Sequence, residues 1–278
     1  MDTSNVLRTR ESKRVRGLVF TFMCGINGFT WQDADLVQRM NYIARYRGPD
    51  GSGYFSNNRV SLGSTRLAII DLDVRADQPL ANENQSVWIV FNGEIYNYKE
   101  LRIELMALGY EFTTESDTEV IIHAYEQYGA DCFNHFNGMW GLAIYDKDKD
   151  TLLLSRDRFG IKPLYYFDDG DNLIFSSMLT SFREHEIELA PNDRAVMEYL
   201  AFSLTQHNQD TFFANIYSLL PGHILIYDLK SRKNRIKQWY YPMPASDKDP
   251  DSLNQAFHDA VRWRTVSDVP VGVCLSGG

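Results

Sequence analysis

Two hairpin patterns in the middle of the chain constrain its fold more than any other feature. Each pairs two short apolar runs across an acidic turn, which indicates antiparallel strands. The runs are 140–145, 152–155, 164–167 and 173–176, and the turns are 146–150 and 168–171. Because amphipathic helical segments precede them, we predict an α+β domain in which helices cover antiparallel sheets.

Three segments before the hairpins show helical periodicity, and one reads as a buried strand. The first two helices are expected near 36–44, before the breakers of Arg47-Gly48-Pro49-Asp50-Gly51, and near 99–108, closed by Gly109. The third is opened by Ser116-Asp117-Thr118-Glu119 and has its apolar face between Val120 and Tyr128. Ser116 and Glu119 have the spacing of a capping box at the start of the third helix. The strand, 87–91, runs directly into Asn92-Gly93-Glu94, which favours a site at a strand end over a hairpin turn.

The C-terminal part changes character. Lys230–Pro250 is polar and proline-containing and is interpreted as a linker, and a helix with Ala256, Phe257, Ala260 and Val261 on one face follows it. Val269–Leu275 has the continuous apolar pattern of a buried parallel strand. It leads into Ser276-Gly277-Gly278, which is either a glycine-rich tail or the start of a backbone cradle for phosphate. Since an α/β domain does not end on its first strand, we expect the chain to be cut short.

Composition excludes several classes of protein. The 278 residues carry a net charge of −9, which argues against nucleic acid or a membrane surface as partner. No apolar run reaches the roughly 18–20 residues of a membrane span. The three cysteines fit neither a disulfide framework nor a paired metal motif, so a reducing cytoplasm is the expected location and no metal site is expected.

Cys24 is the candidate nucleophile, although a cysteine beside glycine is more often a small buried hydrophobe. The basic residues 1–23 are interpreted as a start upstream of the true one at Met23, with a propeptide or a basic arm as alternatives. A start at Met23 with the methionine removed would make Cys24 the N-terminus. Its α-amine, with an ordinary pKa of about 7.7–8.0, could then accept the thiol proton.

A set of motifs, in order, resembles the asparagine synthetase family. They are Cys24-Gly-Ile-Asn-Gly28, Arg47-Gly-Pro-Asp50, Arg66-Leu-Ala-Ile-Ile-Asp71, Phe91-Asn-Gly-Glu-Ile-Tyr-Asn97, Ser116-Asp117, Asn137-Gly-Met139, Arg156 to Tyr165, Ser267 to Gly272 and Leu275 to Gly278. The resemblance implies a class II glutamine amidotransferase with the four-layer αββα sandwich of N-terminal-nucleophile enzymes. The first helix and strand of a truncated α/β ATP-pyrophosphatase domain would follow. The implied domains are 24–229 for the glutaminase, 230–250 for the linker and 251–278 for the start of the synthetase domain.

The resemblance also implies roles. Cys24 would attack the side-chain amide of glutamine, and Asn92 and Gly93 would form the oxyanion hole. Arg66 would hold the substrate carboxylate as a bidentate donor, beside the backbone of Leu67, Ala68, Ile69 and Ile70. Asp117, with Glu94 nearby, would hold the substrate ammonium group.

In the whole family enzyme, ammonia passes to a second domain where ATP, with Mg²⁺, activates aspartate. Leu275, Ser276, Gly277 and Gly278 would begin that ATP site, and the glutaminase half would need no cofactor. Ser177-Met178-Leu179-Thr180 stands where the family commonly has Ser-Glu, an apolar residue and Lys, which puts the coupling of the two halves in doubt. Glutamine, aspartate and ATP are the expected small-molecule partners, and a homodimer stays open. The alternatives are another amide acceptor, or a non-catalytic module if Cys24 is never exposed as the N-terminus.

Overall fold

A computed structural model of the chain describes residues 23–243 and 250–272. The expected nucleotide-binding residues Leu275–Gly278 and the basic segment 1–22 lie outside these described residues. None of the described helices is both long and apolar enough to cross a bilayer.

Two six-stranded sheets form the centre of the molecule, and every pair of adjacent strands is antiparallel. The first sheet has the order β10 (Ile216–Ser218), β8 (Tyr165–Asp168), β9 (Leu173–Ser176), β1 (Gly25–Phe29), β3 (Ser61–Arg66) and β2 (Gly51–Ser56). The second has the order β12 (Lys233–Gln238), β11 (His223–Asp228), β7 (Thr151–Arg156), β6 (Gly138–Asp146), β5 (Val87–Ile95) and β4 (Leu80–Ala81).

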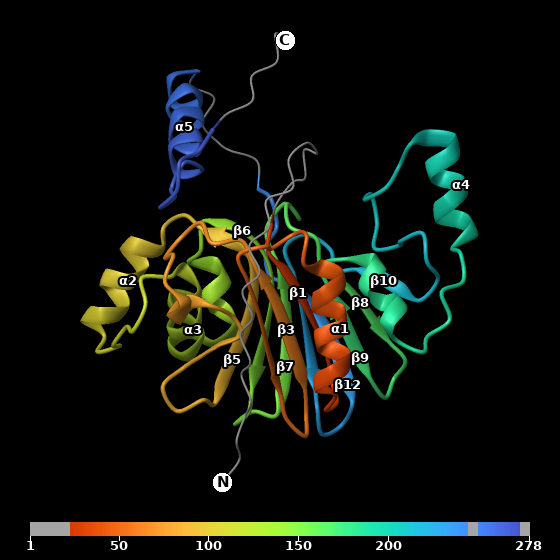
Figure 1. Ribbon diagram of the computed structural model, residues 1–278. Coiled ribbons are helices and arrows are strands. Elements are labelled where there is room, and N and C mark those ends of the chain that lie inside the picture. The colour runs from red at the N-terminus through yellow and green to blue at the C-terminus, as the bar shows by residue number, and fades with distance from the viewer. Residues whose placement is uncertain (1–22, 244–249, 273–278) are drawn as a thin grey trace.

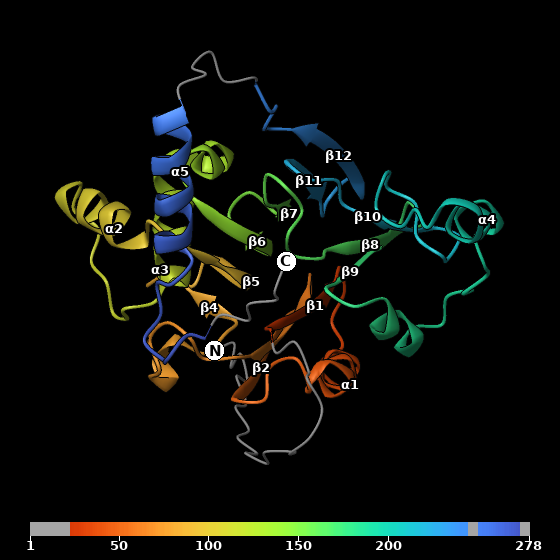
Figure 2. The ribbon, with the colours of Figure 1, turned by 90° about the horizontal axis from the view of Figure 1, so that it is seen from above.

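Helices cover the outer faces of both sheets (Figures 1 and 2). The elements outside the sheets are α1 (Ala34–Ala44), η1 (Val74–Ala76), α2 (Tyr98–Ala107), α3 (Asp117–Tyr128), η2 (Gly129–Asn134), η3 (Leu179–Glu184), α4 (Asp193–Phe202) and α5 (Pro250–Trp263). In both views α2 and α3 lie on one side of the sheets, α1 lies on the other, and α4 lies at the end of the molecule away from α2.

Three apolar clusters fill the spaces between these layers. One fills the space between the sheets, with Ile26 and Leu62 from the first sheet meeting Val90 and Leu154 from the second. A second packs α2 and α3 against the outer face of the second sheet. The third packs α1 and η3 against the outer face of the first. The predicted α+β architecture, a four-layer αββα sandwich, is therefore confirmed.

Both predicted hairpins are confirmed, as β6–β7 and β8–β9. So are the four predicted helices, which correspond to α1, α2, α3 and α5. The predicted capping box does not form: the Ser116 hydroxyl caps the helix by accepting a hydrogen bond from Thr118 N (3.1 Å) instead of Glu119 N, and the Glu119 carboxylate accepts from Thr113 and Thr114 instead of Ser116. The Glu119 side chain therefore bonds the backbone of the preceding loop and not the N-cap residue.

Three other expectations about local structure were wrong. Residues 233–238 of the expected linker form the edge strand β12, whose polar side chains suit a strand that faces solvent. The strand that begins at Val87 does not end at Phe91, because β5 continues to Ile95 and pairs with β6 throughout. Residues 269–272 are not strand, because the described residues include no neighbouring strand with which they could pair in a parallel sheet; 273–275 lie outside the described residues.

The segment after α5 is attached to the sandwich. Asp268 N donates to Ile69 O (2.9 Å), and Asp71 N donates to the Asp268 carboxylate (2.8 Å). The two hydrogen bonds join the C-terminal segment to the loop that follows β3.

Candidate active site

A cavity of about 160 Å³ opens where β1, β3 and β5 approach the start of α3. Its lining comes from six separate parts of the chain. The lining residues are Met23, Cys24, Arg66, Leu67, Ile69, Ile70, Gln78, Phe91, Asn92, Gly93, Glu94, Ser116, Asp117, Thr118 and Lys162. The cavity therefore brings together nearly all of the predicted glutaminase residues.

Cys24 lies half-buried at the edge of this cavity, directly before β1. Its Sγ accepts a hydrogen bond from Leu67 N (3.4 Å), and Arg47 Nε donates to its carbonyl oxygen (3.1 Å). Burial raises the pKa of the Cys24 thiol, and the backbone of Leu67 and the charges of Arg66 and Lys162 act in the opposite direction. The net rise means that this thiol needs a base before it can attack.

Asn92 is 1% exposed, yet neither its Nδ2 nor its Oδ1 has a hydrogen-bond partner in the described structure. An unsatisfied buried amide costs about 1–3 kcal/mol, so its position in the cavity lining points to a ligand that completes its bonding. Gly93, next along β5, has no room for a side chain, because a Cβ there would lie 2.1 Å from Met139 O. The close pairing with β6 therefore requires glycine beside Asn92.

Arg66, at the end of β3, lines the cavity but uses both terminal nitrogens within the protein. Nη1 donates to Asp77 Oδ1 (2.7 Å) and Asp73 O (3.0 Å), and Nη2 donates to Ile70 O (3.1 Å) and to Asp71 O. The bidentate grip on a substrate carboxylate expected from the sequence is not free in this arrangement. Instead, Arg66 holds the loop 67–71 around its own guanidinium.

Within that loop, three of the four expected substrate-binding residues line the cavity: Leu67, Ile69 and Ile70. Ala68 does not belong to the lining. Its N–H donates to the Asp50 carboxylate (3.0 Å), which ties the loop to the segment before β2.

Two carboxylates, Asp117 and Glu94, lie on the cavity wall. Asp117 Oδ2 accepts from Ile95 N (2.9 Å). Burial raises the pKa of Asp117 to about 7, against the effect of that hydrogen bond and with help from the charge of Glu94. Burial also raises the pKa of Glu94. A cation entering the cavity would favour the ionised form of both groups.

Two residues of the cavity wall, Gln78 and Lys162, were not singled out by sequence reasoning. Gln78 donates to the Thr118 hydroxyl (3.3 Å) and accepts from Phe91 N (2.6 Å), so it links β5 to α3. Lys162 belongs to the motif from Arg156 to Tyr165, which served only to recognise the family. A buried cation cannot be read from such a motif, because burial depends on the folded environment.

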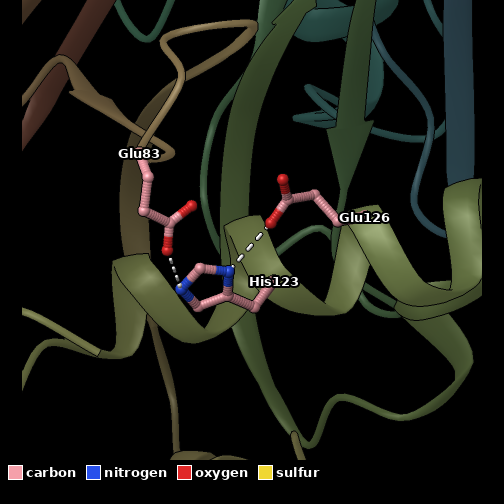
Figure 3. Close-up of side chains that lie close together, drawn as sticks. All are labelled: Glu83, His123 and Glu126. Carbon is pink, nitrogen blue, oxygen red and sulfur yellow. Dashed lines mark hydrogen bonds and ion pairs between the residues drawn. The ribbon is translucent and has the colours of Figure 1, made fainter. Parts of the chain in front are cut away.

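A second cluster of titratable side chains lies away from the cavity, around His123 of α3. Figure 3 shows its imidazole between two carboxylates: Nδ1 lies 2.8 Å from Glu126 Oε2, and Nε2 lies 3.7 Å from Glu83 Oε1. Glu119 Oε1 lies 3.9 Å from Nε2. Burial lowers the pKa of His123, but the surrounding carboxylates outweigh it and raise the pKa to about 9.

The three side chains Glu83, His123 and Glu126 are close enough to hold a metal ion. However, the two carboxylates face different ring nitrogens, an arrangement that suits a doubly protonated imidazolium better than a metal ligand. The cluster is therefore interpreted as an ion-pair network around a buried imidazole, with its Glu83 and Glu126 carboxylates at the surface.

Comparison with known proteins places the chain in a family. Residues 23–241 match the model described as glutamine amidotransferase domain, and residues 252–278 match the model described as asparagine synthase. Asparagine synthetase [glutamine-hydrolyzing] 1 of Bacillus subtilis is 36% identical over 92% of this chain and 42% of its own length. A putative asparagine synthetase 2 of Methanocaldococcus jannaschii is 36% identical over 92% of this chain and 55% of its own length.

The chain thus spans about half the length of these curated relatives. Among solved structures, glutamine phosphoribosylpyrophosphate amidotransferase from B. subtilis superposes with a TM-score of 0.59 over 79% of this chain and 50% of that chain. At 16% identity, this likeness supports the sandwich fold alone. The chain belongs to the glutamine amidotransferase domain family, in the form that glutamine-hydrolysing asparagine synthetases carry at the front of an asparagine synthase domain.

Proposed function

We propose that this chain hydrolyses glutamine to glutamate and ammonia, with Cys24 as the N-terminal nucleophile. The observation that carries the proposal is the unpartnered amide of Asn92 in the same cavity as the Cys24 thiol. A buried donor without a protein acceptor is what a developing oxyanion requires.

The reaction takes two steps. Cys24 Sγ attacks the side-chain carbonyl carbon of glutamine while the thiol proton passes to the α-amine, and the oxyanion accepts hydrogen bonds from Asn92 Nδ2 and Gly93 N–H. The tetrahedral intermediate collapses, and the leaving nitrogen takes the proton from the ammonium of Cys24 and departs as ammonia. Water then attacks the γ-glutamyl thioester through the same oxyanion hole, and glutamate leaves as the thiol is restored.

The two charged ends of glutamine meet different walls of the cavity. Asp117, with Glu94 beside it, receives the substrate ammonium group. Arg66 contributes positive charge toward the carboxylate and fixes the loop that carries Leu67, Ile69 and Ile70. Because its terminal nitrogens already have acceptors, a bidentate contact requires exchange of at least two of these bonds.

For the whole protein, we propose glutamine-dependent, ATP-driven amidation of aspartate in the cytoplasm. The support is the asparagine synthase match at 252–278, together with the names of the relatives. Leu275–Gly278 would contribute to the ATP site, and Mg²⁺ would neutralise phosphate charge there. A division into a glutaminase domain that ends near residue 241, a connecting segment, and a synthetase domain that begins with α5 belongs to the same proposal, and a homodimer is compatible with it.

The experiment compares three preparations with glutamine as the only substrate. A chain expressed from Met23, with removal of the methionine verified by intact mass, should release ammonia. The same chain with Cys24→Ala should release none. The chain that retains residues 1–23 should be inactive, because a peptide bond on the Cys24 nitrogen delocalises its lone pair. Full activity in the long chain would refute the role of the α-amine.

A further inference from the structure

The cavity contains a buried positive charge for which the proposed reaction has no role yet. Lys162 is 8% exposed and lies on the same cavity wall as Cys24 and Glu94. Its Nζ contacts Met23 Sδ at 3.4 Å, and among the described residues no carboxylate forms an ion pair with it. Buried lysines are ordinarily paired, because an uncompensated ammonium is expensive to desolvate.

The loop that carries Lys162 is built to fix its position. The buried carboxylate of Asp157 accepts hydrogen bonds from the backbone N–H groups of Phe159, Ile161 and Lys162, each at 3.0 Å. Arg156 Nε donates to Lys162 O at 2.8 Å. The backbone of Lys162 is thus held by a charge on either side, so its side chain has a defined origin from which to reach the cavity.

Within the described ranges, the ammonium has one hydrogen-bond partner, Met23, which the proposed processing removes. Once Met23 is gone, the thioether contact is lost and the new α-amine of Cys24 stands where the Met23–Cys24 peptide bond was. Lys162 then faces the nucleophile and its base with no intervening side chain from Met23.

We propose that Lys162 is a positioning residue for the nucleophile: its fixed positive charge favours the thiolate of Cys24 and the neutral, proton-accepting form of the Cys24 α-amine. The proposal deepens the proposed function and rests on it. A like charge disfavours protonation of the amine, and an opposite charge stabilises the thiolate, so one ammonium promotes both changes.

Other charged groups face Cys24 as well. Arg47 and Arg66 add positive charge, whereas Asp117 and Glu94 line the same cavity and oppose it. Among the three cations, Arg66 is neutralised by Asp77 (2.7 Å) and Arg47 donates to the Cys24 carbonyl. Lys162, like Arg47, has no carboxylate within ion-pair distance among the described residues, and Glu94 is the main opposite charge acting on it. Its charge lowers the pKa of Cys24, after that of Arg66 and against the dominant effect of burial.

The test measures thiol reactivity, which does not require glutaminase activity. Alkylation of Cys24 by iodoacetamide at pH 8 is followed by peptide mass spectrometry, which distinguishes Cys24 from the other two cysteines. In the 278-residue chain, Lys162→Met should slow alkylation roughly three- to tenfold, because the pKa of the Cys24 thiol should rise by about half to one unit. Lys162→Arg should stay within about twofold of the parent because it keeps the charge. Lys237→Met, on the exposed edge strand β12, is the matched control and should have no effect.

A second measurement separates this inference from the proposed function. In the chain that begins at Cys24, Lys162→Met should move the acid limb of the kcat/KM profile for glutamine to higher pH, because the α-amine then holds its proton more tightly. If no variant hydrolyses glutamine but Lys162→Met still slows alkylation, the proposed function fails and the electrostatic role stands.

Thermal unfolding completes the test. Removing an unpaired buried charge should leave Tm unchanged or raise it. Alkylation at the parent rate in Lys162→Met, or an equal slowing in Lys162→Arg, would overturn the proposal. So would a Tm lowered by several degrees in Lys162→Met, since that result assigns the side chain a structural role.

Discussion

Two polar regions in the described part of the chain differ in how far their charges are compensated. Around His123, Nδ1 lies 2.8 Å from Glu126, which also accepts from Asn82. Nε2 has no hydrogen-bond partner but lies 3.9 Å from Glu119, which accepts from Thr113 and Thr114. In the Cys24 cavity, the Asn92 amide has no partner and Lys162 meets a thioether.

The difference indicates that the His123 region contributes to stability and that the Cys24 cavity serves function. A polar network whose members satisfy one another stabilises and fixes the native state. Polar groups left unsatisfied cost free energy, so their presence around one cavity indicates that a ligand completes them. Both regions use α3, which begins with Asp117 and carries His123 six residues later, in the middle of the helix.

The largest expected effect lies in the His123 network. His123→Gln should lower the free energy of unfolding by about 3 kcal/mol, because it leaves the buried Glu119 carboxylate, and the more exposed Glu126, without their cation. Urea unfolding at pH 7 measures this. His207→Gln is the control, since His207 makes a similar contact with Glu198 (3.0 Å) but is 36% exposed, and it should change stability by less than about 1 kcal/mol. Equal effects of the two substitutions would contradict the assignment of an ion-pair network around a buried imidazole.

Asn92→Ala should act on catalysis and spare stability. We expect kcat for glutamine hydrolysis to fall roughly 10²–10³-fold, as for loss of one oxyanion donor. Asn82→Ala provides the matched opposite: its amide is satisfied by Glu126 (2.7 Å) and by the backbone N–H of Val87 (3.0 Å), so its loss should lower stability and leave kcat unchanged. A loss of stability in Asn92→Ala together with a loss of kcat in Asn82→Ala would contradict the assignment of the two regions.

The His123 network should also give stability a defined pH dependence. The pKa of His123 is about 9 in the folded protein against an ordinary 6.5. The stabilisation is therefore fully present below about pH 6.5 and is lost as pH rises through 9, by roughly 2–3 kcal/mol. The measurement is urea unfolding between pH 6 and 10 with His123→Gln as reference, and a parallel decline in both proteins would argue against an imidazolium.

In the cavity, pH should act on binding instead. Asp117, with a pKa of about 7, must ionise to hold the substrate ammonium group. The Kd for glutamine of the Cys24→Ala chain, measured by calorimetry, should therefore rise as pH falls below 7 and approach about tenfold per pH unit. In a chain that also carries Asp117→Asn, Kd should be higher and nearly independent of pH, and a retained slope would assign the titration to another group.

The sequence predicted the fold well where pattern and burial coincide. The apolar runs of β6, β7, β8 and β9 alternate with acidic turns, and the helices α1 and α3 carry clear apolar faces. The edge strand β12 was missed because Lys233–Gln238 is polar on both faces, so its strand conformation comes from pairing with β11 and leaves no apolar signature.

The site was predictable only as far as motifs identify residues. Cys24, Asn92, Gly93 and Asp117 were selected from sequence and lie in one cavity. Three features of the site were not predictable. Both terminal nitrogens of Arg66 are already hydrogen-bonded within the protein, Ala68 N donates to Asp50 outside the cavity lining, and Lys162 has no carboxylate within ion-pair distance among the described residues. Each depends on which acceptors lie within hydrogen-bond distance after folding, and local sequence does not contain that information.

The most direct test of the central claim is to trap the reaction at Cys24. The chain that begins at Cys24 is mixed with glutamine, quenched in acid within the first turnovers and analysed by peptide mass spectrometry. We predict a γ-glutamyl adduct on the N-terminal cysteine, and no adduct in the chain that retains residues 1–23. Ammonia release by a chain carrying Cys24→Ala, or an adduct on another residue, would contradict the account.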